Sequence, residues 1–124
     1  MGNKNVFVID DEPQILSLFE DALSRHGYTV TSATDGESGL ATLKTLKPDI
    51  IFLDLKLPGM NGAQILQGIR RLYPKVPVVI ITGYPRDSLV DSAIKLDAFA
   101  CLVKPFSMRD VVAIIETVDL GLAE

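Results

Sequence analysis

The sequence alternates short apolar runs with longer segments in which apolar and polar residues recur at helical spacing. Three runs, residues 6–9, 50–53 and 76–81, are apolar at every position and end at polar or turn residues. Such runs predict short strands that are buried on both faces of a sheet. Residues 99–103 predict another strand. Residues 28–33 alternate in a β-prone pattern, which predicts a half-exposed strand at a sheet edge.

Each predicted strand is followed by apolar residues three or four positions apart, which predict five amphipathic helices, the fourth being the weakest. Pro13 suits the first turn of the first helix, and Gly27 is expected to end that helix with His26 in its last turn. Ser107 and Asp110 resemble a capping box, with Asp in place of the usual Glu or Gln. The expected apolar positions are Ile15, Leu18, Phe19, Ala22 and Leu23, then Leu40, Leu43 and Leu46, then Ile65, Leu66, Ile69 and Leu72, then Leu89, Val90, Ala93, Ile94 and Leu96, and finally Val111, Val112, Ile114, Ile115 and Val118.

A strand followed by a helix, repeated five times, predicts an α/β fold with a parallel sheet covered by helices on both faces. The length of 124 residues favours one domain spanning residues 1–124. The doubly wound strand order 2-1-3-4-5 places the first and third strands side by side, with a ligand crevice at their carboxyl ends. We therefore expect a doubly wound, five-stranded parallel sheet with five helices.

Composition and charge argue against several classes of protein. The net charge is −4 and no Lys- or Arg-rich run occurs, so this domain is expected to bind no nucleic acid directly. No apolar run approaches the roughly 18 residues that span a membrane, and the chain starts without the pattern of a signal peptide. Cys101 is the single cysteine, which excludes an internal disulfide and fits a reducing, cytoplasmic setting.

Polar side chains stand where the predicted strands end. Asp10 and Asp11 follow the first strand, Asp54 ends the third, Thr82 ends the fourth and Lys104 follows the fifth. Because the carboxyl ends of parallel strands meet at the same edge of a sheet, we expect these groups to lie close together. A single Asp, Thr or Lys at a strand end is usually a cap or a surface group, so the inference depends on their occurring together.

Three carboxylates held close together repel one another. Two unit charges about 5 Å apart cost roughly 3 kcal/mol at an effective dielectric constant of about 20, so a cation is expected to neutralise the cluster. Oxygen ligands without a nearby His or Cys favour Mg²⁺, which keeps several waters and also binds phosphate oxygens. In such a site Asp54 can act as a nucleophile and form an aspartyl phosphate, while Lys104 and Thr82 can contact the phosphoryl oxygens.

These motifs resemble those of the receiver domains of bacterial response regulators, which act in two-component and phosphorelay signalling. The resemblance covers nearly the whole chain and implies the flavodoxin-like topology of the CheY-like domains. The matching segments are residues 8–13, 54–62, 82–83 and 102–106, with the sequences VIDDEP, DLKLPGMNG, TG and LVKPF.

The resemblance implies a phosphoacceptor and a metal site. Asp54 would take a phosphoryl group from the phosphohistidine of a sensor histidine kinase or a histidine phosphotransfer protein. Asp11, Asp54 and the backbone carbonyl of Lys56 would hold Mg²⁺, with Asp10 acting mostly through water. The domain would not be an enzyme beyond its own phosphorylation and dephosphorylation.

The resemblance also assigns the remaining residues of the site. Thr82 and Lys104 would contact the phosphoryl group, while Lys56 and Tyr84 would tune its hydrolysis. In this family the partners include downstream proteins or an output domain, and a homodimer that depends on phosphorylation. The sequence itself carries no signal for an output domain or for a homodimer.

Two positions depart from the family pattern. Cys101 stands three positions before Lys104, where an aromatic residue usually takes part in the conformational switch. We therefore expect one of three outcomes. The output signal is weaker than is usual in the family, it is carried by Tyr84, or it is absent because the domain only relays phosphate. The alternative is that Cys101 is a small buried apolar residue. Asp97 stands where the family often has Gly and is expected to change the loop before the last strand.

Three rival functions fit the sequence less well. A phosphorylation-independent pseudo-receiver is the main alternative, although Asp10, Asp11, Asp54, Thr82 and Lys104 are all present. A haloacid-dehalogenase-like phosphatase needs a second Asp two positions after the nucleophile, where this chain has Lys56. A flavin carrier of the flavodoxin type needs a phosphate loop after the first strand, and the acidic residues there would repel phosphate. His26, beside Gly27, is expected to be structural.

Overall fold

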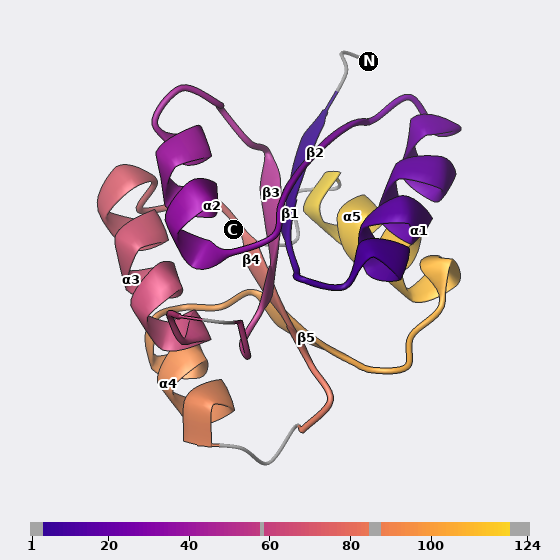
Figure 1. Cartoon of the computed structure of the whole chain (residues 1–124). Coiled ribbons are helices and arrows are strands. Elements are labelled where there is room, and N and C mark those ends of the chain that lie inside the picture. Colours follow the sequence, from indigo (N-terminus) through magenta and orange to yellow (C-terminus); the bar gives the residue numbers. More distant parts are fainter. Residues whose placement is uncertain (1–3, 58, 85–87, 120–124) are drawn as a thin grey trace.

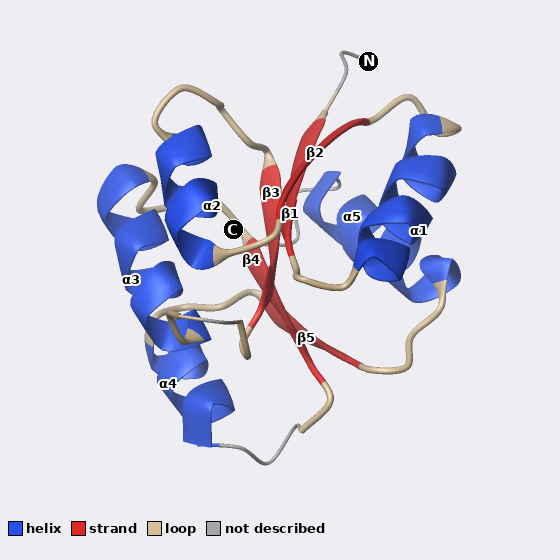
Figure 2. Ribbon diagram, viewed as in Figure 1, coloured by secondary structure: helices blue, strands red, loops and turns tan. Residues whose placement is uncertain are grey.

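The computed structural model, which describes residues 4–57, 59–84 and 88–119, contains a five-stranded parallel sheet with the strand order β2-β1-β3-β4-β5. The predicted doubly wound α/β fold is confirmed, and so is the placement of the first and third strands side by side (Figures 1 and 2). The strands are β1 (Asn5–Ile9), β2 (Thr29–Ala33), β3 (Ile50–Asp54), β4 (Val78–Thr82) and β5 (Ala100–Val103). The helices are α1 (Pro13–Ser24), α2 (Gly36–Leu43), α3 (Gly62–Leu72), α4 (Ser88–Lys95) and α5 (Met108–Asp119).

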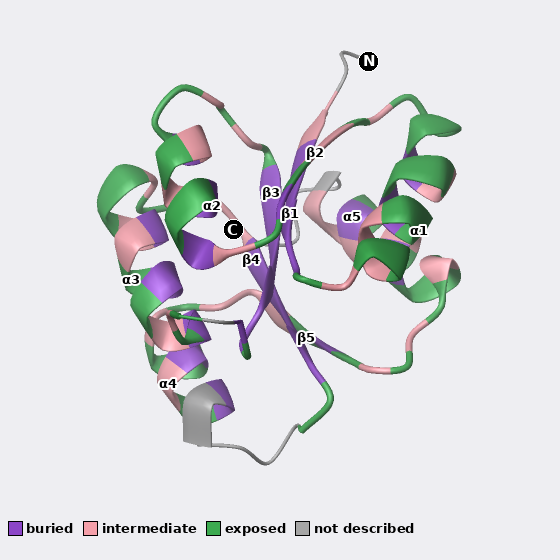
Figure 3. Cartoon of the chain, viewed as in Figure 1, coloured by how far each residue is buried: buried purple, intermediate pink, exposed green. Residues whose placement is uncertain are grey.

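The sheet is the middle of three layers. Helices α1 and α5 cover one face, and α2, α3 and α4 cover the other (Figure 1). The central strands β3 and β4 are buried at every position, which explains why their sequences are apolar up to the final Asp54 and Thr82 (Figure 3). None of the helices in the described residues is long and apolar enough to cross a membrane.

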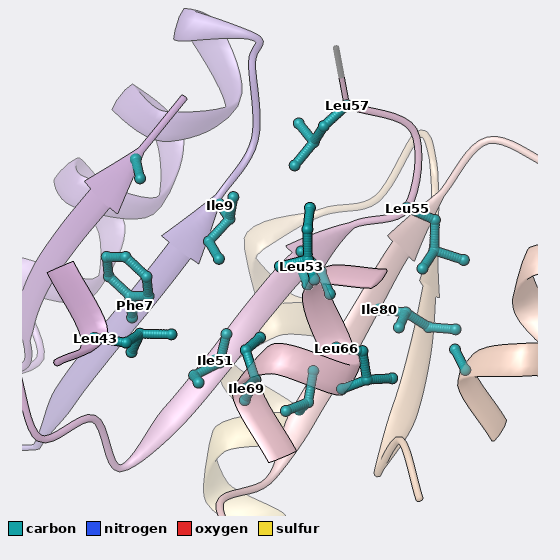
Figure 4. Close-up of a cluster of buried hydrophobic side chains, with 14 of the residues drawn as sticks. Phe7, Ile9, Leu43, Ile51, Leu53, Leu55, Leu57, Leu66, Ile69 and Ile80 are labelled. Atoms are coloured by element: carbon teal, nitrogen blue, oxygen red, sulfur yellow. The ribbon is translucent and has the colours of Figure 1, made fainter. Parts of the chain in front are cut away.

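Alternate residues of the strands build two separate hydrophobic cores. Phe7 and Ile51 belong to the core beneath α2, α3 and α4 (Figure 4), whereas Val8 and Phe52 belong to the core beneath α1 and α5. Each of these four side chains is 0% exposed. Full burial of a large apolar side chain contributes about 1.5–3 kcal/mol. The two cores therefore fix the register of the strands whose ends carry the polar groups.

The position of Cys101 in the edge strand β5 contradicts the prediction that this residue is buried. The residues of β5 alternate between outward and inward positions, so Leu102 is buried while Cys101 and Val103 are exposed. The prediction that Cys101 is a small buried apolar residue is wrong, because the strand period of two turns its side chain away from the core. The predicted edge position of β2 is confirmed.

Several predicted boundaries differ from the structure by a few residues. Helix α1 ends at Ser24, so His26 lies beyond the helix rather than in its last turn. The His26 ring still contacts the helix, because its Nδ1 lies 2.9 Å from the carbonyl oxygen of Ala22. Gly27 follows with a φ of 84°, in the left-handed region that favours glycine, as expected for a residue that ends a helix.

Arg70 joins the end of α3 to two loops, the one before β4 and the one before β5. Its guanidinium donates hydrogen bonds to the carbonyl oxygens of Leu96 at 3.0 Å, Asp97 at 2.9 Å, Val76 at 2.7 Å and Tyr73 at 3.3 Å. Asp97 has a φ of 63°, in the left-handed region that favours glycine. The arginine therefore satisfies backbone acceptors where α4 ends and β5 begins.

Candidate functional site

The three strand ends that the sequence singles out carry the buried polar side chains of the described residues. Asp10, Asp54 and Thr82 are 0%, 5% and 3% exposed, and they are the polar residues of the described part of the chain that are buried. Asp54 ends β3 and Thr82 ends β4, while Asp10 follows β1, which is paired with β3. Burial of three polar groups at one sheet edge costs free energy unless the groups have partners, which marks this edge as a functional candidate.

Asp10, Asp11 and Asp54 form a group of three carboxylates. Each offers an oxygen, and the three oxygens lie within 4.8 Å of one another. One oxygen of Asp10, Oδ2, is buried without a hydrogen-bond partner in the structure, whereas Oδ1 accepts a hydrogen bond of 2.9 Å from the backbone N–H of Glu12. An oxygen-only set with one unsatisfied buried atom fits a hard divalent cation such as Mg²⁺.

The pKa of Asp10 is raised from 3.8 to about 6, mainly by burial and further by the charge of Asp54, against the lowering effect of the hydrogen bond from the Glu12 backbone N–H. The site without a cation thus makes ionisation of this carboxyl unfavourable. A bound cation would favour the ionised form, because it would be an opposite charge within a few ångströms.

Asp54 is held by the loop that follows its strand. Its Oδ1 accepts a hydrogen bond of 2.9 Å from the backbone N–H of Lys56, and its Oδ2 lies 3.2 Å from Lys104 Nζ. The loop closes tightly, because Gly62 N–H donates to the Leu55 carbonyl oxygen at 2.8 Å. A Cβ on Gly62 would come within 2.5 Å of the Leu55 Cα, so only glycine fits there.

Lys104 places a positive charge beside three carboxylates of the site. Its ammonium lies 2.9 Å from Glu12 Oε1, 3.2 Å from Asp54 Oδ2 and 3.6 Å from Asp10 Oδ2. Burial acts to lower the pKa of Lys104, but the hydrogen bond that its ammonium donates to Glu12 and the charges of Asp10 and Asp54 outweigh it, so the pKa lies above its ordinary value. The lysine is therefore fully charged at neutral pH.

Thr82 and Tyr84 complete the wall opposite the carboxylates. The hydroxyl oxygen of Thr82 accepts a hydrogen bond of 2.9 Å from the backbone N–H of Tyr84. The Tyr84 side chain is 64% exposed, and Lys56 Nζ lies 4.7 Å from the centre of its ring, a cation–π contact. These groups line an open cleft of about 460 Å³, whose lining residues are Asp11, Glu12, Asp54, Lys56, Thr82, Gly83, Tyr84 and Lys104.

The structure brings together the acidic residues, Thr82, Lys104, Lys56 and Tyr84 as the sequence predicted. Cys101 is not among the residues that line the cleft. Glu12 was not predicted from the sequence as a member of the site and was included only in the motif of residues 8–13. Its carboxylate nevertheless makes the shortest contact to Lys104. Its pairing joins residues 92 positions apart, so no local signal could have revealed it.

Comparisons with known proteins agree with this geometry. A family model described as the response regulator receiver domain matches residues 6–116. The chain is 36% identical over 111 residues to the DNA-binding transcriptional regulator NtrC of Salmonella typhimurium, covering 90% of this chain and 24% of that protein. It is 34% identical over 116 residues to the alkaline phosphatase synthesis transcriptional regulatory protein PhoP of Bacillus subtilis, covering 94% and 48%. The chain thus spans less than half the length of these relatives.

Solved structures give the same result. The chain is similar to the chemotaxis response regulator CheY4 of Vibrio cholerae, with a TM-score of 0.86, 25% identity and coverage of 94% of this chain and 98% of that one. It is also similar to a CheY-like receiver domain protein of Methanospirillum hungatei, with a TM-score of 0.91, 27% identity and coverage of 98% and 97%. The fold, the clustered strand-end residues and the family match do not favour the pseudo-receiver alternative. The chain belongs to the family of response-regulator receiver domains.

Proposed function

We propose that this receiver domain, spanning residues 1–124, accepts a phosphoryl group on Asp54 from the phosphohistidine of a sensor histidine kinase or a histidine phosphotransfer protein. The observation that carries the proposal is the convergence of Asp54, two further carboxylates, Lys104 and Thr82 at one sheet edge. A carboxylate oxygen of Asp54 forms the new bond to phosphorus as the bond from phosphorus to the histidine nitrogen breaks. That nitrogen keeps the electron pair.

Asp11, Asp54 and the backbone carbonyl of Lys56 would hold Mg²⁺, with Asp10 acting mostly through water. The buried oxygen of Asp10 that lacks a hydrogen bond and the mutual approach of the three carboxylates support this assignment. When bound, Mg²⁺ supplies positive charge that neutralises the carboxylates and the transferred phosphoryl oxygens.

Lys104 and Thr82 stabilise the phosphoryl group after transfer. The ammonium of Lys104 already lies 3.2 Å from Asp54 Oδ2, so a phosphoryl group on Asp54 would lie within its reach. The hydroxyl of Thr82, at the end of the neighbouring strand, can rotate its O–H toward a phosphoryl oxygen. Lys56 and Tyr84 flank the open side of the cleft, where they control access of water and so tune hydrolysis.

The signal leaves the domain by a route that does not depend on an aromatic residue at position 101. Cys101 is exposed on β5 and lacks the bulk to follow a movement of Thr82 inward. Tyr84 follows Thr82 by two positions, donates its N–H to the Thr82 hydroxyl and exposes its ring. We propose that Tyr84 carries the output, or that the domain relays the phosphoryl group, in the cytoplasm, to a downstream protein or output domain. A homodimer that depends on phosphorylation belongs to the same proposal.

The test is phosphorylation by a small donor. Incubation with acetyl phosphate and Mg²⁺ should add one phosphoryl group, detected by intact-protein mass spectrometry, which is absent without Mg²⁺. Asp54→Asn should abolish the addition. Asp21→Asn, which removes an exposed carboxylate from α1, should not. Persistent phosphorylation of the Asp54→Asn variant at the wild-type rate would refute the assignment.

A further inference from the structure

Glu12 makes a side-chain contact that its position at the start of α1 does not require. It occupies the N-cap position of α1, where a short polar side chain such as Asp or Ser ordinarily accepts a hydrogen bond from the helix that follows. Glu12 makes no such bond. Its carboxylate contacts Lys104 instead, at 2.9 Å, and the two side chains are 38% and 23% exposed. The side chain therefore has a partner across the cleft in place of a capping role.

Glu12 also stands apart from the carboxylates that fit a cation. The group that could share one ion consists of Asp10, Asp11 and Asp54, and Glu12 is not a member. A cation bound to those three would weaken their attraction for Lys104, because it would neutralise their charge. The contact with Glu12 would then be the main anionic contact that Lys104 retains among the described residues.

We propose that Glu12 is a positioning residue that holds the Lys104 ammonium beside the cleft until a phosphoryl group displaces its carboxylate. The inference rests on the proposed function, in which Lys104 contacts the phosphoryl group. Lys104 exchanges one anionic partner for another, and no covalent bond changes. Because breaking the first ion pair opposes formation of the second, Glu12 lowers the affinity of the site for the phosphoryl group.

The affinity of the site is measured with beryllium fluoride, a phosphoryl mimic, at saturating Mg²⁺. Glu12→Gln keeps the shape of the side chain and removes its charge. Because partly exposed ion pairs are weak, the variant should bind the mimic about two- to fivefold more tightly than the wild type. Glu20→Gln, which makes the same charge change at an exposed position of α1, is the control and should leave the affinity unchanged.

A general repulsion between Glu12 and the anionic mimic would also tighten binding in Glu12→Gln, so the same substitution is made in a Lys104→Met background. If Glu12 acts through Lys104, its effect on affinity should largely disappear there. An equal effect in both backgrounds, or no gain of affinity in Glu12→Gln alone, overturns the inference.

A second readout does not depend on the affinity of the lysine variant. In the wild type, the carbon-13 signal of the Glu12 carboxylate should shift on saturation with beryllium fluoride, because the ammonium leaves it, while the Glu20 signal should not. An unmoved Glu12 signal overturns the inference and leaves the proposed function standing. A wild-type protein that binds no beryllium fluoride and takes no phosphoryl group would instead remove the proposed function, and this inference with it.

Discussion

At the scale of single residues, the site is a set of charged side chains. Without a cation, the repulsion among its carboxylates is unfavourable. Asp10 is fully buried, one of its oxygens lacks a hydrogen bond, and burial raises its pKa to about 6. Such a group is retained at a cost in stability, which is expected where function demands it. The cost can be measured, because it depends on pH in a known direction.

Asp10→Asn should stabilise the protein when Mg²⁺ is removed. The folded state binds the Asp10 proton more tightly than the unfolded state, because the pKa is about 6 instead of 3.8. The contribution of Asp10 to stability therefore falls as pH rises between those two values and is lowest above pH 6. Each pKa unit corresponds to about 1.4 kcal/mol, so the variant should gain up to about 3 kcal/mol at pH 7.

The measurement is urea unfolding of the variant and the wild type in EDTA at pH 7 and pH 4. The gain should shrink toward pH 4, where the wild-type carboxyl is protonated in the folded state. Asp21→Asn, at an exposed position, should show no comparable gain at either pH. A gain of the same size at both pH values would exclude ionisation of Asp10 as its cause.

At the scale of elements, α3 links the other helices that cover its face of the sheet. Besides Arg70, its end carries Tyr73, whose hydroxyl lies within hydrogen-bond distance of the carbonyl oxygens of Leu43, the last residue of α2, and of Leu46. The start of α3 is closed by a capping box between Asn61 and Gln64. One helix thus satisfies backbone groups at the ends of both of its neighbours, so damage to α3 should be felt beyond that helix.

Arg70→Ala should destabilise the protein by about 1–3 kcal/mol, because it leaves backbone carbonyl groups without their charged donor. The matched control is Arg71→Ala on the same helix, because Arg71 is exposed. Its cost should stay within about 0.5 kcal/mol. Thermal or urea unfolding of the two variants provides the comparison. Equal losses would mean that the loss of a positive charge or of helix propensity matters, and not the hydrogen bonds.

The loop before β5 offers a test of backbone conformation. Asp97 has a φ of 63°, where a residue with a Cβ is strained and glycine is not. Asp97→Gly should therefore be more stable than Asp97→Ala by about 1 kcal/mol. Both variants lose the same carboxylate and its attraction to Arg70, so the difference in their unfolding free energies reports the backbone alone. A more stable alanine variant would contradict the strained conformation.

At the scale of the whole molecule, the site lies between elements rather than on one of them. Its residues come from the ends of β1, β3 and β4, from the loop after β5 and from the start of α1. Both hydrophobic cores hold these strands in register, so ligand binding at the edge is linked to folding of the entire domain.

Mg²⁺ should raise the melting temperature of the domain. A cation that binds only the folded state adds about 2.7 kcal/mol of stability at a concentration of 100 times its dissociation constant. Asp11→Asn should abolish this increase while melting in EDTA close to the wild type, because Asp11 is exposed and its loss leaves the cores intact. Scanning calorimetry with equal ionic strength from NaCl separates specific binding from screening. An undiminished increase in Asp11→Asn would remove Asp11 from the ligand set.

The sequence alone predicted the order of the elements, the parallel sheet and the strand-end positions of Asp10, Asp11, Asp54, Thr82 and Lys104. It could do so because burial on two faces leaves a continuous apolar run, and the polar residue that ends such a run is visible in one dimension. The periodicity was less informative at boundaries, as with His26, because helix ends depend on local capping as well as on the apolar pattern.

The three-dimensional fold was needed to show which way Cys101 points, which backbone groups Arg70 contacts and which carboxylate lies nearest Lys104. The sequence of a short apolar strand does not show which of its two faces is buried. The neighbouring elements determine that, and β5 pairs with another strand along one edge only. The pairing of Glu12 with Lys104 depends on how the start of α1 and the loop after β5 meet in space. Electrostatic energy depends on such distances between atoms, and separation along the chain does not specify them.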